Sequence, residues 1–192
     1  MASRTQIVCL CEGRKGGSID EVFINRLIKS LRPVWLRPWS GSNVIRLVPC
    51  GGRKELVEKF PAELVRCHGV GGLATLMVWA DCDDDCADPE ALKAHFWSEA
   101  QRQSITRVQF EQVVFIFAKD RIENWIEYLA TGNTDESKEG PRVNFNREAA
   151  EAARKLAELC DKGKPLTNIP PSLQWSCENW HNLRKRMKTY RV

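Results

Sequence analysis

Three acidic residues in this chain of 192 residues are spaced so that their carboxylates could do metal chemistry. Glu12 directly follows the apolar run 7–11, and Asp81 directly follows the apolar run 73–80. Asp83 lies two residues beyond Asp81, so in an extended segment both side chains point to the same side, with Cα atoms about 6.6 Å apart. Carboxylate oxygens with few histidines nearby favour Mg²⁺ or Mn²⁺ over zinc. The three acids therefore predict a divalent metal site.

The elements that must position these acids follow from the hydrophobic pattern. Apolar, β-branched segments alternate with stretches of helical periodicity, which is typical of a parallel sheet covered by helices. Strands are expected at residues 5–11, 44–48, 73–80 and 113–118. Helices are expected at residues 19–31, 54–65, 89–104, 121–129, 147–159 and 172–188. We expect an α/β fold with a mostly parallel four-stranded sheet flanked by helices, formed by residues 1–130, and a loop and helical C-terminal extension, residues 131–192, packed on it.

Local signals support two of these helices. Ser18 is a candidate N-cap for the helix that begins at Ile19, and Glu21 stands at the capping-box offset. Pro61 is expected to kink or break the second helix, and Pro89 is suited to the first turn of the third.

With right-handed crossovers, the carboxyl ends of all four strands share the edge where open α/β sheets bind ligands. Glu12 and Asp81 then converge, and their mutual repulsion calls for a cation. For the other acids of residues 84–90 we favour a solvated loop and helix cap. An EF-hand is excluded, because Cys86 replaces its turn glycine and Leu92 its bidentate glutamate.

The segments "IVCLCEG" and "LMVWADCDDD", with the β/α alternation between them, resemble the TOPRIM fold of topoisomerases, primases, recombination proteins and overcoming-lysogenization-defect (OLD) nucleases. The resemblance covers about residues 5–130. The pair Asp20-Glu21 and the segment "DRIENWIEYL" are most similar to small OLD-like TOPRIM proteins found near prokaryotic defence systems. The longer turn at residues 14–19 leaves open whether Asp20 or Glu21 faces the metal. The metal-binding or catalytic acids that the likeness implies are Glu12, Glu21, Asp81, Asp83 and Glu123.

The resemblance implies an Mg²⁺-dependent (or Mn²⁺-dependent) nuclease or nuclease subunit that hydrolyses phosphodiester bonds of DNA or RNA, in prokaryotic antiviral defence. Glu12, Asp81 and Asp83 are the expected catalytic residues. An ABC-type ATPase and a second copy of the chain are further candidate partners. Topoisomerase or primase activity is not expected in a chain of this length. The alternative is a catalytically inactive module of the same fold that binds a partner protein or nucleic acid.

Basic residues that could bind nucleic acid lie mainly near the C-terminus, since residues 147–192 hold ten Lys or Arg against five Asp or Glu. Lys54 follows the Gly51-Gly52 turn at a helix start, a place that suits phosphate. For Lys54 and for the C-terminal basic residues alike, the alternative is a solvent-exposed charge that binds no ligand. The segment "LRPVWLRPW" alternates Arg and Trp and suits either base stacking or a packed loop. The basic residues of the tail are Arg184, Lys185, Arg186, Lys188 and Arg191.

The composition and the remaining motifs exclude several classes of protein. With 43% hydrophobic and 28% charged residues, the chain is expected to be globular rather than disordered. Its N-terminal apolar run is too short for a signal peptide or a membrane span, so we expect a cytoplasmic protein with no membrane contact and with reduced, mostly buried thiols at its eight cysteines. A zinc site is disfavoured because Cys82 and Cys86 lack a second Cys-x-x-Cys partner. The segment "GRKGGS" matches neither a P-loop nor a dinucleotide fingerprint.

Overall fold

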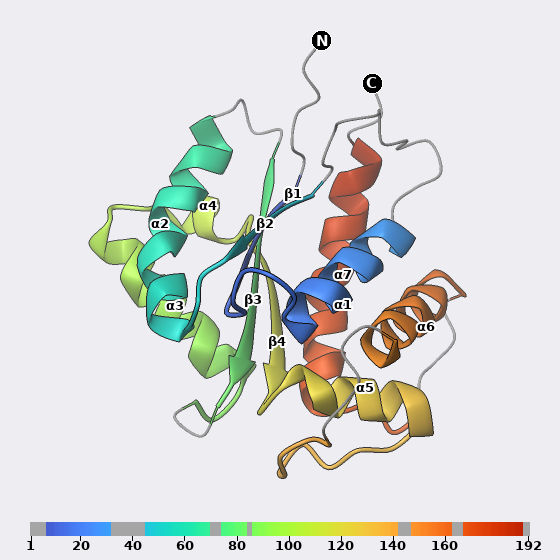
Figure 1. Ribbon diagram of the computed structural model, residues 1–192. Helices are drawn as coiled ribbons and strands as arrows, with labels where there is room; N and C mark the ends of the chain where they lie inside the picture. The colour runs from blue at the N-terminus through green and yellow to red at the C-terminus, as the bar shows by residue number, and fades with distance from the viewer. Residues whose placement is uncertain are drawn as a thin grey trace.

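The strands form one sheet at the centre of the molecule (Figure 1). Its order is β2-β1-β3-β4 and all three pairings are parallel. The strands are β1 Ile7–Cys11, β2 Ile45–Pro49, β3 Thr75–Cys82 and β4 Val114–Lys119. The predicted α/β class, with a parallel four-stranded sheet flanked by helices, is confirmed. The computed structural model describes residues 7–31, 45–69, 74–83, 86–141, 147–162 and 167–189.

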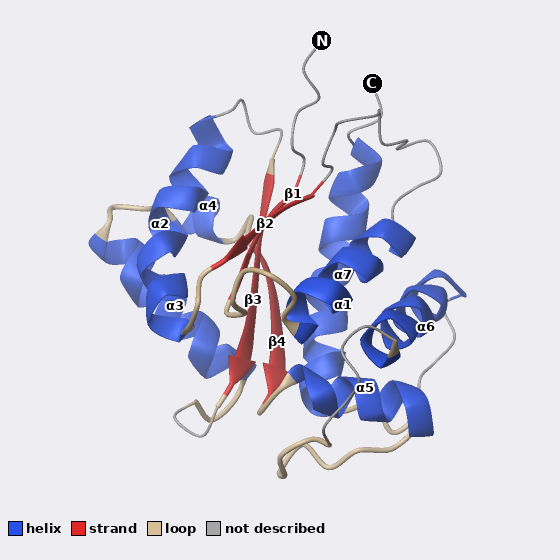
Figure 2. Ribbon diagram, in the orientation of Figure 1, coloured by secondary structure: helices blue, strands red, loops and turns tan. Residues whose placement is uncertain are grey.

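Helices cover both faces of the sheet (Figure 2). One face carries α2 Arg53–Gly69, α3 Pro89–Arg102 and α4 Arg107–Phe110. The other face carries α1 Ile19–Leu31, α5 Ile122–Thr131, α6 Glu148–Lys162 and α7 Pro171–Thr189. Because side chains alternate along a strand, Met77 and Trp79 enter the core beneath α1 and α5, whereas Val78 and Ala80 enter the core beneath α2 and α3. The sheet is thus buried on both sides, which explains the near-continuous apolar run of β3.

Local signals account for the helix boundaries. The Ser18 hydroxyl accepts a hydrogen bond of 3.2 Å from the backbone N–H of Glu21, so Ser18 caps α1 as predicted. Pro61 does not break α2, which continues to Gly69, four residues past the expected end. The hydrogen bond that proline removes is offset by burial of the helix face that contains Phe60. The short helix α4 was not predicted; a capping box holds it.

The C-terminal helices share the main core rather than forming a separate one. Helix α6 packs on α1 and α5, and α7 packs along β4. Trp180 of α7 is 1% exposed and meets the Trp79 ring nearly edge-on, with centroids 6.0 Å apart. Trp175 stacks on Phe117 of β4 with centroids 5.4 Å apart. These two tryptophans therefore anchor the last helix to the core.

Some predicted features lie outside the described residues. They are positions 32–39 of the "LRPVWLRPW" segment, the acids Asp84 and Asp85, and Arg191. Of the seven cysteines that the structure places as free thiols, six are buried. Among the described helices, none is both long and apolar enough to cross a membrane.

Candidate functional site

The strand order reverses between β1 and β3, at the carboxyl ends of these two strands. The chain leaves β1 toward β2 on one side and reaches β3 on the other, with α1 and α2 on opposite faces. Open α/β sheets bind ligands where the strand order reverses in this way. Glu12 directly follows β1, Asp81 is the penultimate residue of β3, and Asp83 directly follows β3. The structure thus brings these three predicted acids to one edge of the sheet.

Alternation along β3 decides which way Asp81 faces. Asp81 has the same parity as Met77 and Trp79, so its side chain points toward the α1 and α5 side of the sheet. Asp20 lies in the first turn of α1 and Glu123 in the first turn of α5. Both act on the pKa of Asp81. An inner group of three acids, Asp20, Asp81 and Glu123, therefore forms on this side.

Gly13 allows Asp20 to approach Glu12. A Cβ on Gly13 would overlap the Ser18 hydroxyl and would lie 2.9 Å from the Ser18 Cβ and 3.1 Å from Asp20 Oδ2. Real Cβ atoms essentially never show contacts below 3.0 Å. The glycine of the Glu-Gly pair is thus required by the packing of α1's first turn against the end of β1.

Glu21 faces away from the other acids. Its Oε2 accepts hydrogen bonds from the backbone N–H groups of Gly16, at 3.3 Å, and Gly17, at 2.9 Å. Both glycines have positive φ, 103° and 110°, so this turn needs their conformational freedom. Of the two residues left open by the sequence, Asp20 joins the acidic group and Glu21 stabilises the turn.

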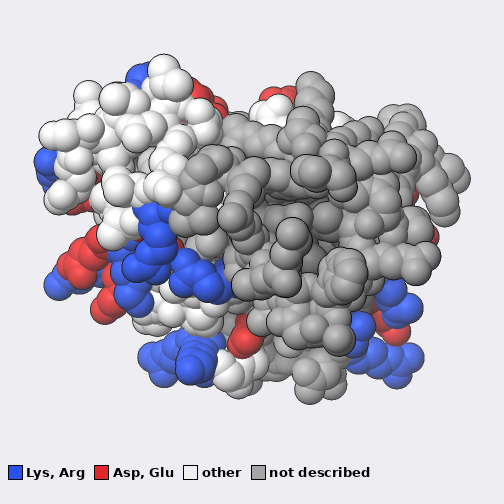
Figure 3. Space-filling view, turned by 90° about the horizontal axis from the view of Figure 1, so that it is seen from above, with Lys and Arg blue, Asp and Glu red and all other residues white. Residues whose placement is uncertain are grey.

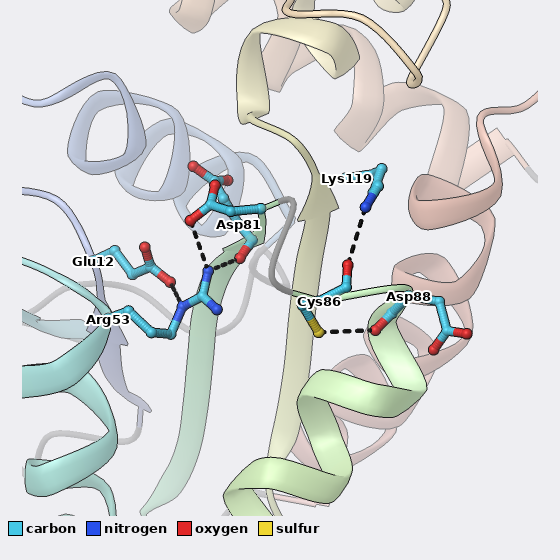
Figure 4. Close-up of polar contacts among 7 residues, drawn as sticks. Glu12, Arg53, Asp81, Cys86, Asp88 and Lys119 are labelled. Carbon is cyan, nitrogen blue, oxygen red and sulfur yellow. Dashed lines mark hydrogen bonds and ion pairs between the residues drawn. The ribbon is translucent and has the colours of Figure 1, made fainter.

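Arg53 bridges the acids from the opposite side (Figure 4). It is the first residue of α2, and its Nε donates a hydrogen bond to the Glu12 carboxylate. Its Nη2 donates to the backbone carbonyl of Asp81 and, at 3.2 Å, to the Asp83 carboxylate. The side chains of Arg53 and Glu12 are only 19% and 18% exposed, so this ion pair is shielded from water.

The sequence predicts Lys54 as the phosphate-binding residue at this helix start, whereas the side chain that reaches the acids is that of Arg53. Lys54 is exposed on the first turn of α2. The signal for Arg53 was present, because it follows the Gly51-Gly52 turn at the end of β2, on the edge shared by the acids. Helical geometry then points adjacent residues in different directions, which the sequence could not resolve.

Glu123 is enclosed by the segment that follows α5. A Cβ on Gly140 would lie 3.0 Å from the Glu123 Cβ and 2.8 Å from the backbone nitrogen of Asn124. An ion pair between Arg121 and Glu139 fastens the same segment to the start of α5. The predicted surface loop thus packs beside the acidic edge.

Burial and mutual repulsion raise the pKa values of the clustered acids. The pKa of Asp81 is raised well above its usual value, mainly by burial and then by the charges of the neighbouring acids Asp20, Glu12, Asp83 and Glu123. Burial, followed by the charges of Glu123 and Glu12, raises the pKa of Asp20 to about 7. The pKa of Glu12 is also raised by burial, although Arg53 opposes the rise. Asp81 Oδ1 is buried and has no hydrogen-bond partner.

This donor set fits a hard divalent cation. Carboxylate oxygens are the ligands that Mg²⁺ takes in proteins, and an unpaired, buried carboxylate oxygen is costly unless a cation or donor satisfies it. Within the described ranges, no three His, Cys, Asp or Glu side chains converge closely enough to hold an ion as they stand. The residues that could hold a cation after local adjustment are Glu12, Asp20, Asp81, Asp83 and Glu123.

Among the predicted nucleic-acid contacts, Lys54 is the one whose side chain is described. The side chains of Arg184, Lys185, Arg186 and Lys188 lie outside the described part, although α7 itself extends to Thr189. In the view of Figure 3, Lys and Arg side chains lie at both the left and the right of the face, with Asp and Glu among them. No continuous basic surface is visible on the described part of that face.

A separate pocket of about 710 Å³ lies between α5 and α6. Apolar residues such as Ile126 and Leu129 line it together with Glu151 and Lys155. Lys155 donates a 2.6 Å hydrogen bond to the Leu129 carbonyl at the end of α5. None of the clustered acids lines this pocket, so it is distinct from the acidic edge.

The fold and the site together define the class: a three-layer α/β protein with an acidic cluster at the reversal point of a parallel sheet. Comparison of the chain with protein-family models, with curated proteins and with solved structures found no match. The resemblance to TOPRIM proteins therefore stays a prediction that rests on the strand-end motifs.

Proposed function

We propose that this protein is a Mg²⁺-dependent nuclease, or the nuclease subunit of a larger assembly, acting in the cytoplasm on DNA or RNA. The proposal is carried by one observation: Asp81 Oδ1 is buried, has no hydrogen-bond partner, and lies among acids whose charges act on it. A divalent cation would satisfy that oxygen and neutralise the cluster at the same time.

The residues that would hold the cation are Asp81 with Asp20 and Glu12, supported by Asp83 and Glu123. A bound divalent ion supplies a Lewis acid for a phosphate oxygen and lowers the pKa of bound water. The pKa of Asp20 is about 7 in the metal-free protein, so binding of the cation near neutral pH would release its proton. Antiviral defence, an ABC-type ATPase partner and self-association belong to the same proposal and rest on the TOPRIM resemblance alone.

The experiment compares metal-dependent cleavage by the wild type and Asp81→Asn. Labelled single-stranded and duplex DNA and RNA are incubated with Mg²⁺, Mn²⁺ or a chelator. We expect Asp81→Asn to lose activity by about 100-fold or more, because it removes charge from the centre of the cluster.

Asp88→Asn is the matched control. The Asp88 carboxylate caps α3 by accepting a 2.9 Å hydrogen bond from Ala91, and asparagine caps helices equally well. This control should cleave like the wild type. Cleavage that survives both Asp81→Asn and the chelator would contradict the proposal.

The second candidate is the inactive module that binds a partner or nucleic acid. It is favoured by the fact that Arg53 already pairs with Glu12 and Asp83 without any metal. Binding of labelled nucleic acid, or of a partner, with no cleavage under any metal condition would support this alternative.

A further inference from the structure

We propose that Arg53 is the resident counter-cation of the acidic cluster, and that a divalent ion binds by displacing its guanidinium from Glu12 and Asp83. This inference rests on the proposed function, because it concerns how the same acids change between the metal-free and metal-bound protein.

The backbone fixes Arg53 beside Glu12 through two neighbouring turns. The N–H of Cys50 donates to the carbonyl of Cys11 at 2.8 Å, and the N–H of Gly51 donates to the carbonyl of Gly13 at 3.3 Å. Gly51 has φ of 90°, a value that L side chains rarely adopt. These hydrogen bonds join the turn before α2 to the turn after β1. They thereby place the Arg53 guanidinium beside Glu12.

The charges are only partly balanced by this arrangement. Arginine keeps one positive charge at every accessible pH, whereas the cluster contains five carboxylates. Arg53 contacts the carboxylates of Glu12 and Asp83 and bonds the backbone carbonyl of Asp81. The inner carboxylates of Asp81 and Asp20 remain destabilised by burial and by the charges of the neighbouring acids.

A divalent ion can satisfy the inner carboxylates better than Arg53 does. It carries twice the charge and binds several oxygens at once, and the oxygens it needs include the one that Arg53 holds on Glu12. The guanidinium and the ion therefore compete for the same oxygen. Once displaced, the guanidinium remains beside the acidic edge, where its several N–H donors suit a phosphate.

The two possible roles of Arg53 predict opposite effects on metal affinity. If Arg53 competes with the ion, removing its charge leaves Glu12 and Asp83 uncompensated and strengthens metal binding. If Arg53 only positions the acids, its removal disorders them and weakens binding. Metal affinity therefore separates competition from a merely structural role.

The experiment is calorimetric titration of Mn²⁺ into wild type, Arg53→Met and Arg53→Lys, with circular dichroism to confirm folding. Arg66→Met is the matched control, since Arg66 lies on the same helix and pairs with Glu63 away from the cluster. We expect Arg53→Met to bind Mn²⁺ about tenfold more tightly, the scale of a hydrogen bond to a charged group. Arg53→Lys keeps the charge but loses the fork, so about threefold tighter binding is expected. The control should bind like the wild type.

Equal or weaker Mn²⁺ binding by folded Arg53→Met overturns the inference and leaves the metal site standing. Should Arg53→Met fail to fold, the same comparison is made with Arg53→Lys. If neither the wild type nor the variants bind Mn²⁺, the inference fails together with the proposed nuclease. If only the variants bind, displacement is overturned: Arg53 then excludes the ion from the wild type, which is the inactive module.

Discussion

At the scale of single residues, the acidic cluster is a site of concentrated electrostatic cost. Asp81 and Asp20 are half-buried close to other carboxylates, and Arg53 contacts the outer pair, Glu12 and Asp83. Acids with perturbed pKa values cluster at functional sites, because such an arrangement lowers stability and is kept for its chemistry. This electrostatic cost should be measurable in the free energy of unfolding of the metal-free protein.

Asp20 should make the free energy of unfolding depend on pH. Its pKa is about 7 in the folded protein, against an ordinary value of 3.8. Between these values the folded state holds a proton that the unfolded chain has released. The stabilising contribution is therefore complete below about pH 4 and is lost as pH rises through 7, with a slope of up to about 1.4 kcal/mol per pH unit. Urea unfolding between pH 5 and 8 in a chelator measures it.

Asp20→Asn should flatten this dependence and raise stability at pH 8, because it removes the titrating group. Asp81 shifts in the same direction, so some dependence should persist in the variant. Asp88→Asn serves as the control and should keep the full wild-type slope. Equal slopes in wild type and Asp20→Asn would contradict the placement of Asp20 in the cluster.

Gly13→Ala should destabilise the fold through overpacking. The added Cβ would meet Ser18 and the Asp20 carboxylate at distances that force the start of α1 to move, at a cost of about 1–3 kcal/mol. Gly69→Ala is the matched control, because a Cβ there meets nothing within 4 Å and its φ is not positive. Chemical unfolding measures the free energy of unfolding of both variants. Equal values would show that the first turn of α1 moves to accommodate the Cβ at no cost.

At the scale of elements, α7 closes the edge of the sheet at β4. The Ser176 hydroxyl accepts a 3.0 Å hydrogen bond from the N–H of Phe117 and donates a 3.1 Å hydrogen bond to its carbonyl. An edge strand otherwise presents unpaired backbone groups that invite aggregation. A single serine on a helix thus substitutes for part of a fifth strand.

Ser176→Ala should destabilise the protein by about 1–3 kcal/mol, because it leaves buried backbone groups of β4 without partners. Amide hydrogen exchange at Phe117 should accelerate by the corresponding factor. The exposed Ser98, whose hydroxyl bonds only the carbonyl of Ala94 in its own helix, supplies the control Ser98→Ala. That variant should change stability by less than about 0.5 kcal/mol. Unchanged exchange at Phe117 would rule out the proposed edge closure.

At the scale of the whole molecule, one core joins the first and last thirds of the chain. The cluster beneath α1 and α5 includes Phe23 and Trp79 together with Leu156, Leu173 and Trp180 from the last two helices. The acidic edge depends on this core, since α1 and α5 present Asp20 and Glu123. The C-terminal helices therefore support the site without contributing an acid to it.

Trp180→Ala should lower the free energy of unfolding by about 3–5 kcal/mol, as expected for loss of a fully buried tryptophan. Because the core is continuous, unfolding should remain a single transition when followed by far-ultraviolet circular dichroism and by fluorescence. Two separate transitions, of which the substitution shifts the earlier and leaves the later in place, would instead indicate that the C-terminal helices unfold independently. Val108→Ala, at a side chain 72% exposed, is the control and should be nearly neutral.

The sequence by itself determined the parallel α/β sheet and the edge at which Glu12, Asp81 and Asp83 meet. Periodicity is a local signal, and parallel strands carry their carboxyl ends to one side whatever the packing. Only the tertiary structure decided that Asp20 rather than Glu21 joins the cluster and that Arg53 rather than Lys54 contacts the acids. Each choice lies between neighbours in sequence, and the direction of a side chain at a helix start depends on the exact turn that precedes it, here shaped by Gly13 and Gly51.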